Sequence, residues 1–97
     1  MRLTTIEQQT ILKIAKQIYG DDVHIYLFGS RTDKSKRGGD IDLLVRTISE
    51  KKKGLSERLR MQTRLKIALG DQKIDIIGDY EEVPFMSEIL AKGILLQ

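Results

Sequence analysis

The chain has 97 residues, of which 40% are hydrophobic and 32% are charged, and its formal net charge is +3. This length and composition predict a single globular domain over residues 1–97 and exclude an intrinsically disordered protein. The lack of cysteine excludes a disulfide framework and a thiolate metal site. Because no stretch approaches the roughly 20 apolar residues that cross a bilayer, we expect a soluble cytoplasmic protein that does not enter a membrane.

The basic residues are concentrated in the middle of the chain. Residues 31–66 contain twelve Lys and Arg but only five Asp and Glu, so this segment carries +7 and the remainder −4. An anionic ligand or partner would explain the excess, and so would a solvated helix face beside a polar loop. No aromatic cluster accompanies the charge, so we do not expect sequence-specific binding of nucleic acid.

The N-terminal part predicts a helix followed by a strand. Thr4 and Glu7 have the spacing of a capping box, and apolar residues recur at 6, 11, 14, 15 and 18. Gly20 is a suitable stop, so we expect the helix over residues 4–19. Residues 23–28 (VHIYLF) are rich in β-branched and aromatic side chains and predict a strand.

The next segment predicts a turn, a loop and a second strand. Ser30 can cap a short helical turn through about residue 35, and residues 36–39 predict a loop. The connection over residues 29–39 is short, but it could be a crossover if it holds that helical turn. A strand is expected over residues 40–46, and residues 47–53 are compatible with more than one structure.

The C-terminal half predicts two helices, a third strand and an apolar tail. Five apolar residues form a helical stripe: Leu55, Leu59, Leu65, Ala68 and Leu69. Met61 and Ile67 lie outside this stripe, where we expect exposure. Residues 72–77 predict a strand, residues 84–92 predict a helix with Pro84 in its first turn, and residues 94–96 could add a final strand. Strands separated by helices indicate an α/β (α+β) fold.

Two aspartates interrupt the otherwise apolar second strand, and one interrupts the third. Because side chains alternate along a strand, Asp40 and Asp42 point to the same face, roughly 6–7 Å apart. The apolar residues between and after them form the opposite, core face. If the second and third strands lie side by side, Asp75 converges on the same spot. Alternatively, each aspartate could lie at a strand edge and face water.

Three convergent carboxylates would repel one another and raise at least one pKa unless a cation is bound. Oxygen ligands favour a hard ion, Mg²⁺ or Mn²⁺, and such a cluster commonly holds the metals of in-line phosphoryl transfer. Gly29 and Ser30 are a complementary feature, because glycine permits a close backbone approach and amides at the start of a helix bind anions. Taken alone, this Gly-Ser pair could equally be an ordinary strand-to-helix turn, and no P-loop Gly-Lys-Ser/Thr follows it.

These residues together resemble a known family. Gly29-Ser30-Arg31, a short polar loop and then Gly39-Asp40-Ile41-Asp42-Leu43-Leu44-Val45 are similar to the Gly-Ser…Asp-x-Asp signature of the DNA polymerase β-like nucleotidyltransferase superfamily. The length, Asp75 within residues 73–77, and the segment 88–94 are similar to its minimal nucleotidyltransferases (MNT). The resemblance spans nearly the whole chain. Gly39 is a departure, because many relatives have serine before the first Asp.

The resemblance implies a short mixed twisted sheet with helices packed on it. It implies ATP and Mg²⁺ as ligands and transfer of AMP to an acceptor. In HEPN–MNT toxin–antitoxin systems, the MNT antitoxin adenylylates a tyrosine of its HEPN ribonuclease toxin. The resemblance therefore implies a HEPN-domain partner and a hetero-oligomer.

The resemblance also assigns roles to single residues. Asp40 and Asp42 would ligate the metals, and Asp75 would be a third ligand that helps to deprotonate the acceptor hydroxyl. Residues 29–31 (Gly29, Ser30 and Arg31) would bind the nucleotide, the first two at the triphosphate and the third through a phosphate contact.

Two other functions stay open. The chain could neutralise a HEPN partner by contact alone, with weak or absent catalysis. It could also transfer a nucleotide to a small molecule, although relatives that modify antibiotics usually carry an extra domain, for which this chain has no room. The presence of all three acids favours the protein adenylyltransferase.

Overall fold

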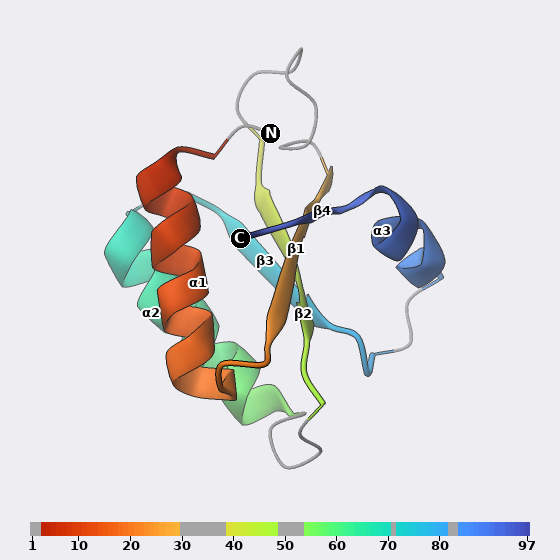
Figure 1. The fold of residues 1–97 in the computed structure, drawn as a ribbon. Helices are drawn as coiled ribbons and strands as arrows, with labels where there is room; N and C mark the ends of the chain where they lie inside the picture. Colours follow the sequence, from red (N-terminus) through yellow and green to blue (C-terminus); the bar gives the residue numbers. More distant parts are fainter. Residues whose placement is uncertain (1–2, 30–38, 49–53, 71, 82–83) are drawn as a thin grey trace.

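A four-stranded mixed sheet, in the spatial order β3-β2-β1-β4, organises the fold (Figure 1). The structure, a computed structural model, describes residues 3–29, 39–48, 54–70, 72–81 and 84–97. The elements follow one another along the chain: α1 (Thr5–Tyr19), β1 (His24–Phe28), β2 (Ile41–Arg46), α2 (Leu55–Leu69), β3 (Ile74–Gly78), α3 (Met86–Lys92) and β4 (Ile94–Leu95). The predicted helices and strands among these residues are confirmed to within two residues. The helical turn predicted over residues 30–35 lies outside the described residues.

The strand directions agree with the mixed sheet that the family resemblance implies. β1 pairs antiparallel with β2 and with β4, whereas β2 pairs parallel with β3. Because β1 and β2 are antiparallel neighbours, the connection between them is not the crossover that the sequence left open. The crossover is instead made by α2, which links the two parallel strands.

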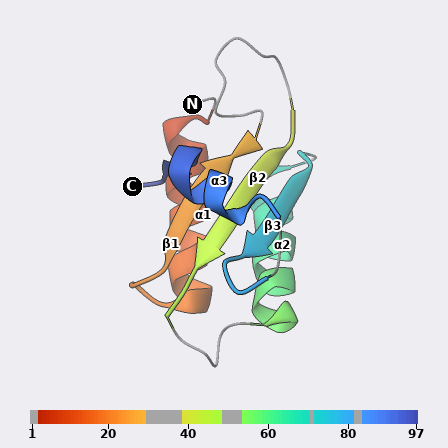
Figure 2. The same cartoon turned by 90° about the vertical axis from the view of Figure 1, so that its right-hand side faces the viewer.

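The helices are divided between the two faces of the sheet. α1 and α2 lie together over one face, and α3 lies over the other (Figures 1 and 2). The inward residues of β2 fill the space under α1 and α2, and Ile41, Leu43 and Val45 are almost fully buried, as predicted. Leu44 points to the opposite face and is also fully buried, in agreement with the position of α3.

α1 begins as the sequence predicts, but one residue of its apolar stripe does not reach the core. The Thr4 hydroxyl accepts a hydrogen bond from the Glu7 amide at 3.0 Å, and the Glu7 carboxylate accepts one from the Thr4 amide at 2.9 Å. Ile11 and Ile14 are buried, whereas Ile6 is 74% exposed. With 3.6 residues per turn, Ile6 lies on a different side of the helix from the buried residues.

α2 corrects the sequence prediction more strongly. Leu55, Leu59 and Ala68 were expected in the core but are exposed, and Met61, expected outside the stripe, is fully buried. Ile67 is 81% exposed, as predicted. The apolar residues of this helix occupy more than one side, so packing against α1 and β3 selects the face that contains Met61.

No helix within residues 3–29, 39–48, 54–70, 72–81 and 84–97 combines the length and the apolar character that a bilayer crossing requires.

Candidate active site

The sheet register brings two of the predicted site residues into direct opposition. Asp42 of β2 is paired in register with Asp75 of β3, and both side chains point away from the α1 and α2 layer. The condition that the sequence analysis set, namely that the second and third strands lie side by side, is therefore met. The parallel pairing therefore places two carboxylates next to each other on the face that α3 only partly covers.

The two carboxylates influence each other electrostatically. Burial raises the pKa of Asp42 from its ordinary value of 3.8 to about 6, and the charges of Asp75 and Asp40 and a hydrogen bond to Asp75 act in the same direction. The positive charge of Lys73 opposes these effects. The pKa of Asp42 therefore lies above the usual range of an aspartate, a perturbation that is common among carboxylates of functional sites.

Asp40 lies at the entrance of β2 but points its carboxylate to a lysine. Its Oδ2 lies 3.6 Å from Lys73 Nζ, and both side chains are well exposed. The backbone holds these two segments together, because the Ile41 amide donates to the Lys73 carbonyl at 2.9 Å. The sequence did not single out Lys73, and only its position before the third strand could have suggested it.

In the part of the chain that the structure describes, no group of three or more Asp, Glu or His side chains is arranged to hold a metal ion. The donor set nevertheless suits a hard cation, because two of the three carboxylates already contact each other and their crowding raises a pKa. Asp40 would complete the set by leaving an exposed ion pair, which costs only about 0–1 kcal/mol. The chemistry of the three carboxylates thus fits a divalent cation.

Gly29 closes the site from the side of β1. Its φ is +77°, and a Cβ at this position would overlap the carboxylate of Asp42. Only glycine lets the chain adopt this conformation and pass so close to the acid. Of the three residues predicted to bind the nucleotide, Gly29 is therefore beside Asp42, whereas Ser30 and Arg31 lie outside the described residues.

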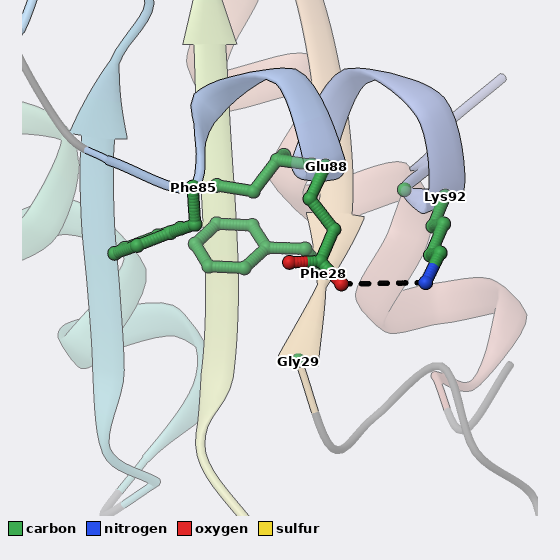
Figure 3. Close-up of a pocket in the computed structure, with 7 residues that line it drawn as sticks. Phe28, Gly29, Phe85, Glu88 and Lys92 are labelled. Carbon is green, nitrogen blue, oxygen red and sulfur yellow. Dashed lines mark hydrogen bonds and ion pairs between the residues drawn. The ribbon is translucent and has the colours of Figure 1, made fainter.

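A pocket that the sequence did not predict adjoins Gly29 (Figure 3). Its volume is about 310 Å³, and it lies between the end of β1 and α3. Seven residues line it: Phe28, Gly29, Phe85, Glu88, Ile89, Lys92 and Gly93. No sequence signal indicates this pocket, because it exists only where α3 crosses the sheet.

Comparison with known proteins agrees with this geometry. Residues 9–97 match the family described as polymerase beta, nucleotidyltransferase. A chain in the crystal structure of a mutant of the toxin–antitoxin MntA–HpeT superimposes with a TM-score of 0.72 and 21% identity, covering 93% of this chain and 71% of that one. At this identity the likeness shows a shared fold. No curated protein matches the chain in sequence. The family match covers nearly all the residues that build the sheet and the carboxylate pair, and the chain therefore belongs to the polymerase β nucleotidyltransferase family.

Proposed function

We propose that the chain is the antitoxin of a toxin–antitoxin pair and that it transfers AMP from ATP to a tyrosine hydroxyl of a HEPN toxin. The observation that carries the proposal is the Asp42–Asp75 carboxylate pair with Gly29 directly beside it. Membership of the nucleotidyltransferase family supports the reaction class. The shared fold with a chain of a toxin–antitoxin complex supports the kind of partner. A cytoplasmic location, where ATP is plentiful, belongs to the same proposal.

In the proposed reaction the acceptor oxygen attacks the α-phosphorus of ATP. A bond forms between these two atoms, and the bond from the α-phosphorus to the oxygen that bridges to the β-phosphorus breaks. Pyrophosphate leaves with that bonding electron pair, and Asp75 accepts the proton of the hydroxyl. Burial, followed by the charge of Asp75, raises the pKa of Asp42, which supports the close placement of the two carboxylates that the reaction requires.

Asp40, Asp42 and Asp75 would hold Mg²⁺ or Mn²⁺, which when bound supplies positive charge against the triphosphate and the carboxylates. Gly29 would let the triphosphate approach the backbone at the end of β1. Lys73 adds a positive charge at the rim of the site and would keep the Asp40 carboxylate oriented before ligand enters.

The test combines the purified chain, labelled ATP, Mg²⁺ and the toxin encoded beside it. We expect label on the toxin with the wild type, and no label with Asp42→Asn or when EDTA replaces Mg²⁺. Asp22→Asn is the matched control, because Asp22 is exposed in the turn at the opposite end of β1 and should leave transfer intact. If the wild type transfers no label but still neutralises the toxin, the proposed adenylyltransferase activity is refuted.

A second function, neutralisation by contact without transfer, is favoured by one observation. The Asp40 carboxylate faces Lys73, so the three acids are not gathered around one point. Under this alternative Asp42→Asn protects cells from the toxin as well as the wild type does. Under the proposed function the variant fails to protect, although it still folds and still binds the toxin.

A further inference from the structure

We infer that the pocket between β1 and α3 holds the base of the nucleotide whose phosphates lie at Gly29. This inference rests on the proposed function and adds where its nucleotide substrate is recognised. The pocket and the carboxylate site are continuous, because Gly29 lines the pocket and also lies against Asp42. Phe28, the next pocket residue, is the register partner of Asp42.

The lining of the pocket has the chemistry of a base-binding site. Phe28 and Phe85 have ring centroids 6.4 Å apart with planes inclined at 44°, so they form an open aromatic corner (Figure 3). Phe85 is 46% exposed, so its ring is accessible to a ligand in the pocket. Bases stack readily on aromatic side chains, and the volume of about 310 Å³ lies at the lower end for ligand pockets.

The mouth of the pocket provides groups that can hydrogen-bond a base edge. Glu88 and Lys92 are one turn apart on α3, and their Oε1 and Nζ atoms are 3.3 Å apart (Figure 3). Both side chains are exposed, so this ion pair opens at little cost. Lys92 then offers donors and Glu88 offers acceptors, whereas nucleobases carry both kinds of group on their edges.

The floor of the pocket is closely packed at Gly93. A Cβ at Gly93 would come within 2.5 Å of the Ile89 carbonyl oxygen and 3.3 Å of the Leu27 carbonyl oxygen. The end of α3 therefore packs against the backbone of β1 beneath the pocket. A pocket whose backbone is already in place binds a planar group at a lower cost in ordering than a pocket that must first form.

The position of the pocket in the sheet favours the donor nucleotide over the acceptor. In the strand order β3-β2-β1-β4, the pocket lies on the β1 side of Asp42, whereas Asp75 lies on the β3 side. Asp75 is the carboxylate proposed to take the acceptor proton, so the acceptor must approach from the β3 side. The β1 side, next to Gly29, is left for the nucleotide.

The test measures the affinity of the wild type for ATP and for inorganic tripolyphosphate, each with Mg²⁺, by calorimetry. If the base is held, the wild type binds ATP more tightly than tripolyphosphate. Phe85→Ala should then weaken ATP binding by about 5- to 160-fold, as expected for the loss of one stacked aromatic ring. Tripolyphosphate binding stays unchanged in this variant. Leu90→Ala is the matched control, because Leu90 is a partly exposed residue of α3 that does not line the pocket. It should alter neither affinity.

Three results would overturn the inference. The first is that the wild type binds ATP and tripolyphosphate with equal affinity. The second is that Phe85→Ala loses affinity for both ligands equally. The third is that Phe85→Ala binds ATP normally but transfers less AMP to the toxin. The last result would identify an acceptor pocket. Phe85-dependent ATP binding without any AMP transfer would support the base pocket and refute the proposed function. AMP transfer together with equal affinities for ATP and tripolyphosphate would support the proposed function and refute the base pocket.

Discussion

Replacing Asp42 by asparagine should stabilise the metal-free protein at neutral and alkaline pH. In the folded chain the pKa of Asp42 is about 6, above its ordinary value of 3.8, because the carboxyl is partly buried and lies beside Asp75 and Asp40. Ionising Asp42 therefore costs more in the folded than in the unfolded state. Asparagine removes the charge, keeps the shape, and can donate a hydrogen bond to Asp75.

The size and pH range of this effect follow from the two pKa values. One pKa unit corresponds to about 1.4 kcal/mol, so the difference corresponds to at most about 3 kcal/mol. Solvent screens the half-buried carboxyl, so we expect a gain of about 1–2 kcal/mol in the free energy of unfolding. Between pH 3.8 and 6 the folded wild type binds more protons than the unfolded chain, so its stability falls as pH rises. The destabilisation of the folded state by ionised Asp42 is absent below this range and complete above it.

The assay is urea unfolding in EDTA at intervals from pH 4 to pH 8. At pH 8 the free energy of unfolding of Asp42→Asn should exceed that of the wild type. The difference between the two proteins should shrink toward pH 4. Asp22→Asn, in the exposed turn, should stay within about 0.5 kcal/mol of the wild type throughout. If the asparagine variant is no more stable at pH 8, or if its advantage does not shrink in acid, the repulsion between Asp42 and its neighbours has been misjudged.

Two further substitutions test the packing around the site and the corrected face of α2. Gly29→Ala should destabilise more than Gly70→Ala in urea unfolding, because both have positive φ (+77° and +82°) but only the Cβ at Gly29 meets other atoms, those of Asp42. Equal losses, each of about 1–2 kcal/mol from backbone strain, would show that Asp42 moves away freely. Met61→Ala should cost about 2–5 kcal/mol and Ile67→Ala less than about 0.5 kcal/mol in thermal or urea unfolding. If Ile67→Ala cost more stability than Met61→Ala, the buried face of α2 would be the one that contains Ile67 and not the one that contains Met61.

Local signals in the sequence were sufficient for most elements of the fold. The capping box at Thr4 and Glu7 and the stop at Gly20 depend on neighbours within one turn, so they could be identified without tertiary information. The alternation of Asp42 with buried Ile41 and Leu43 is likewise a property of one strand. These local patterns also indicated that Asp42 and Asp75 could meet if β2 and β3 were adjacent, and the sheet register pairs these two residues.

Long-range packing decided what the local patterns left open. The pattern of α2 contained two competing apolar faces, and contact with α1 and β3 buried Met61 while leaving Leu59 exposed. The parallel register of β2 and β3 placed Asp42 opposite Asp75, which no spacing along the chain encodes. The pocket at Phe28 and Phe85 joins residues far apart in sequence, so it appears only when α3 crosses the sheet. The sequence by itself determined which chemical groups this protein has and on which face of a strand they lie, because periodicity is local. Only the tertiary structure decided which of those groups meet, because meeting depends on strand order and helix packing.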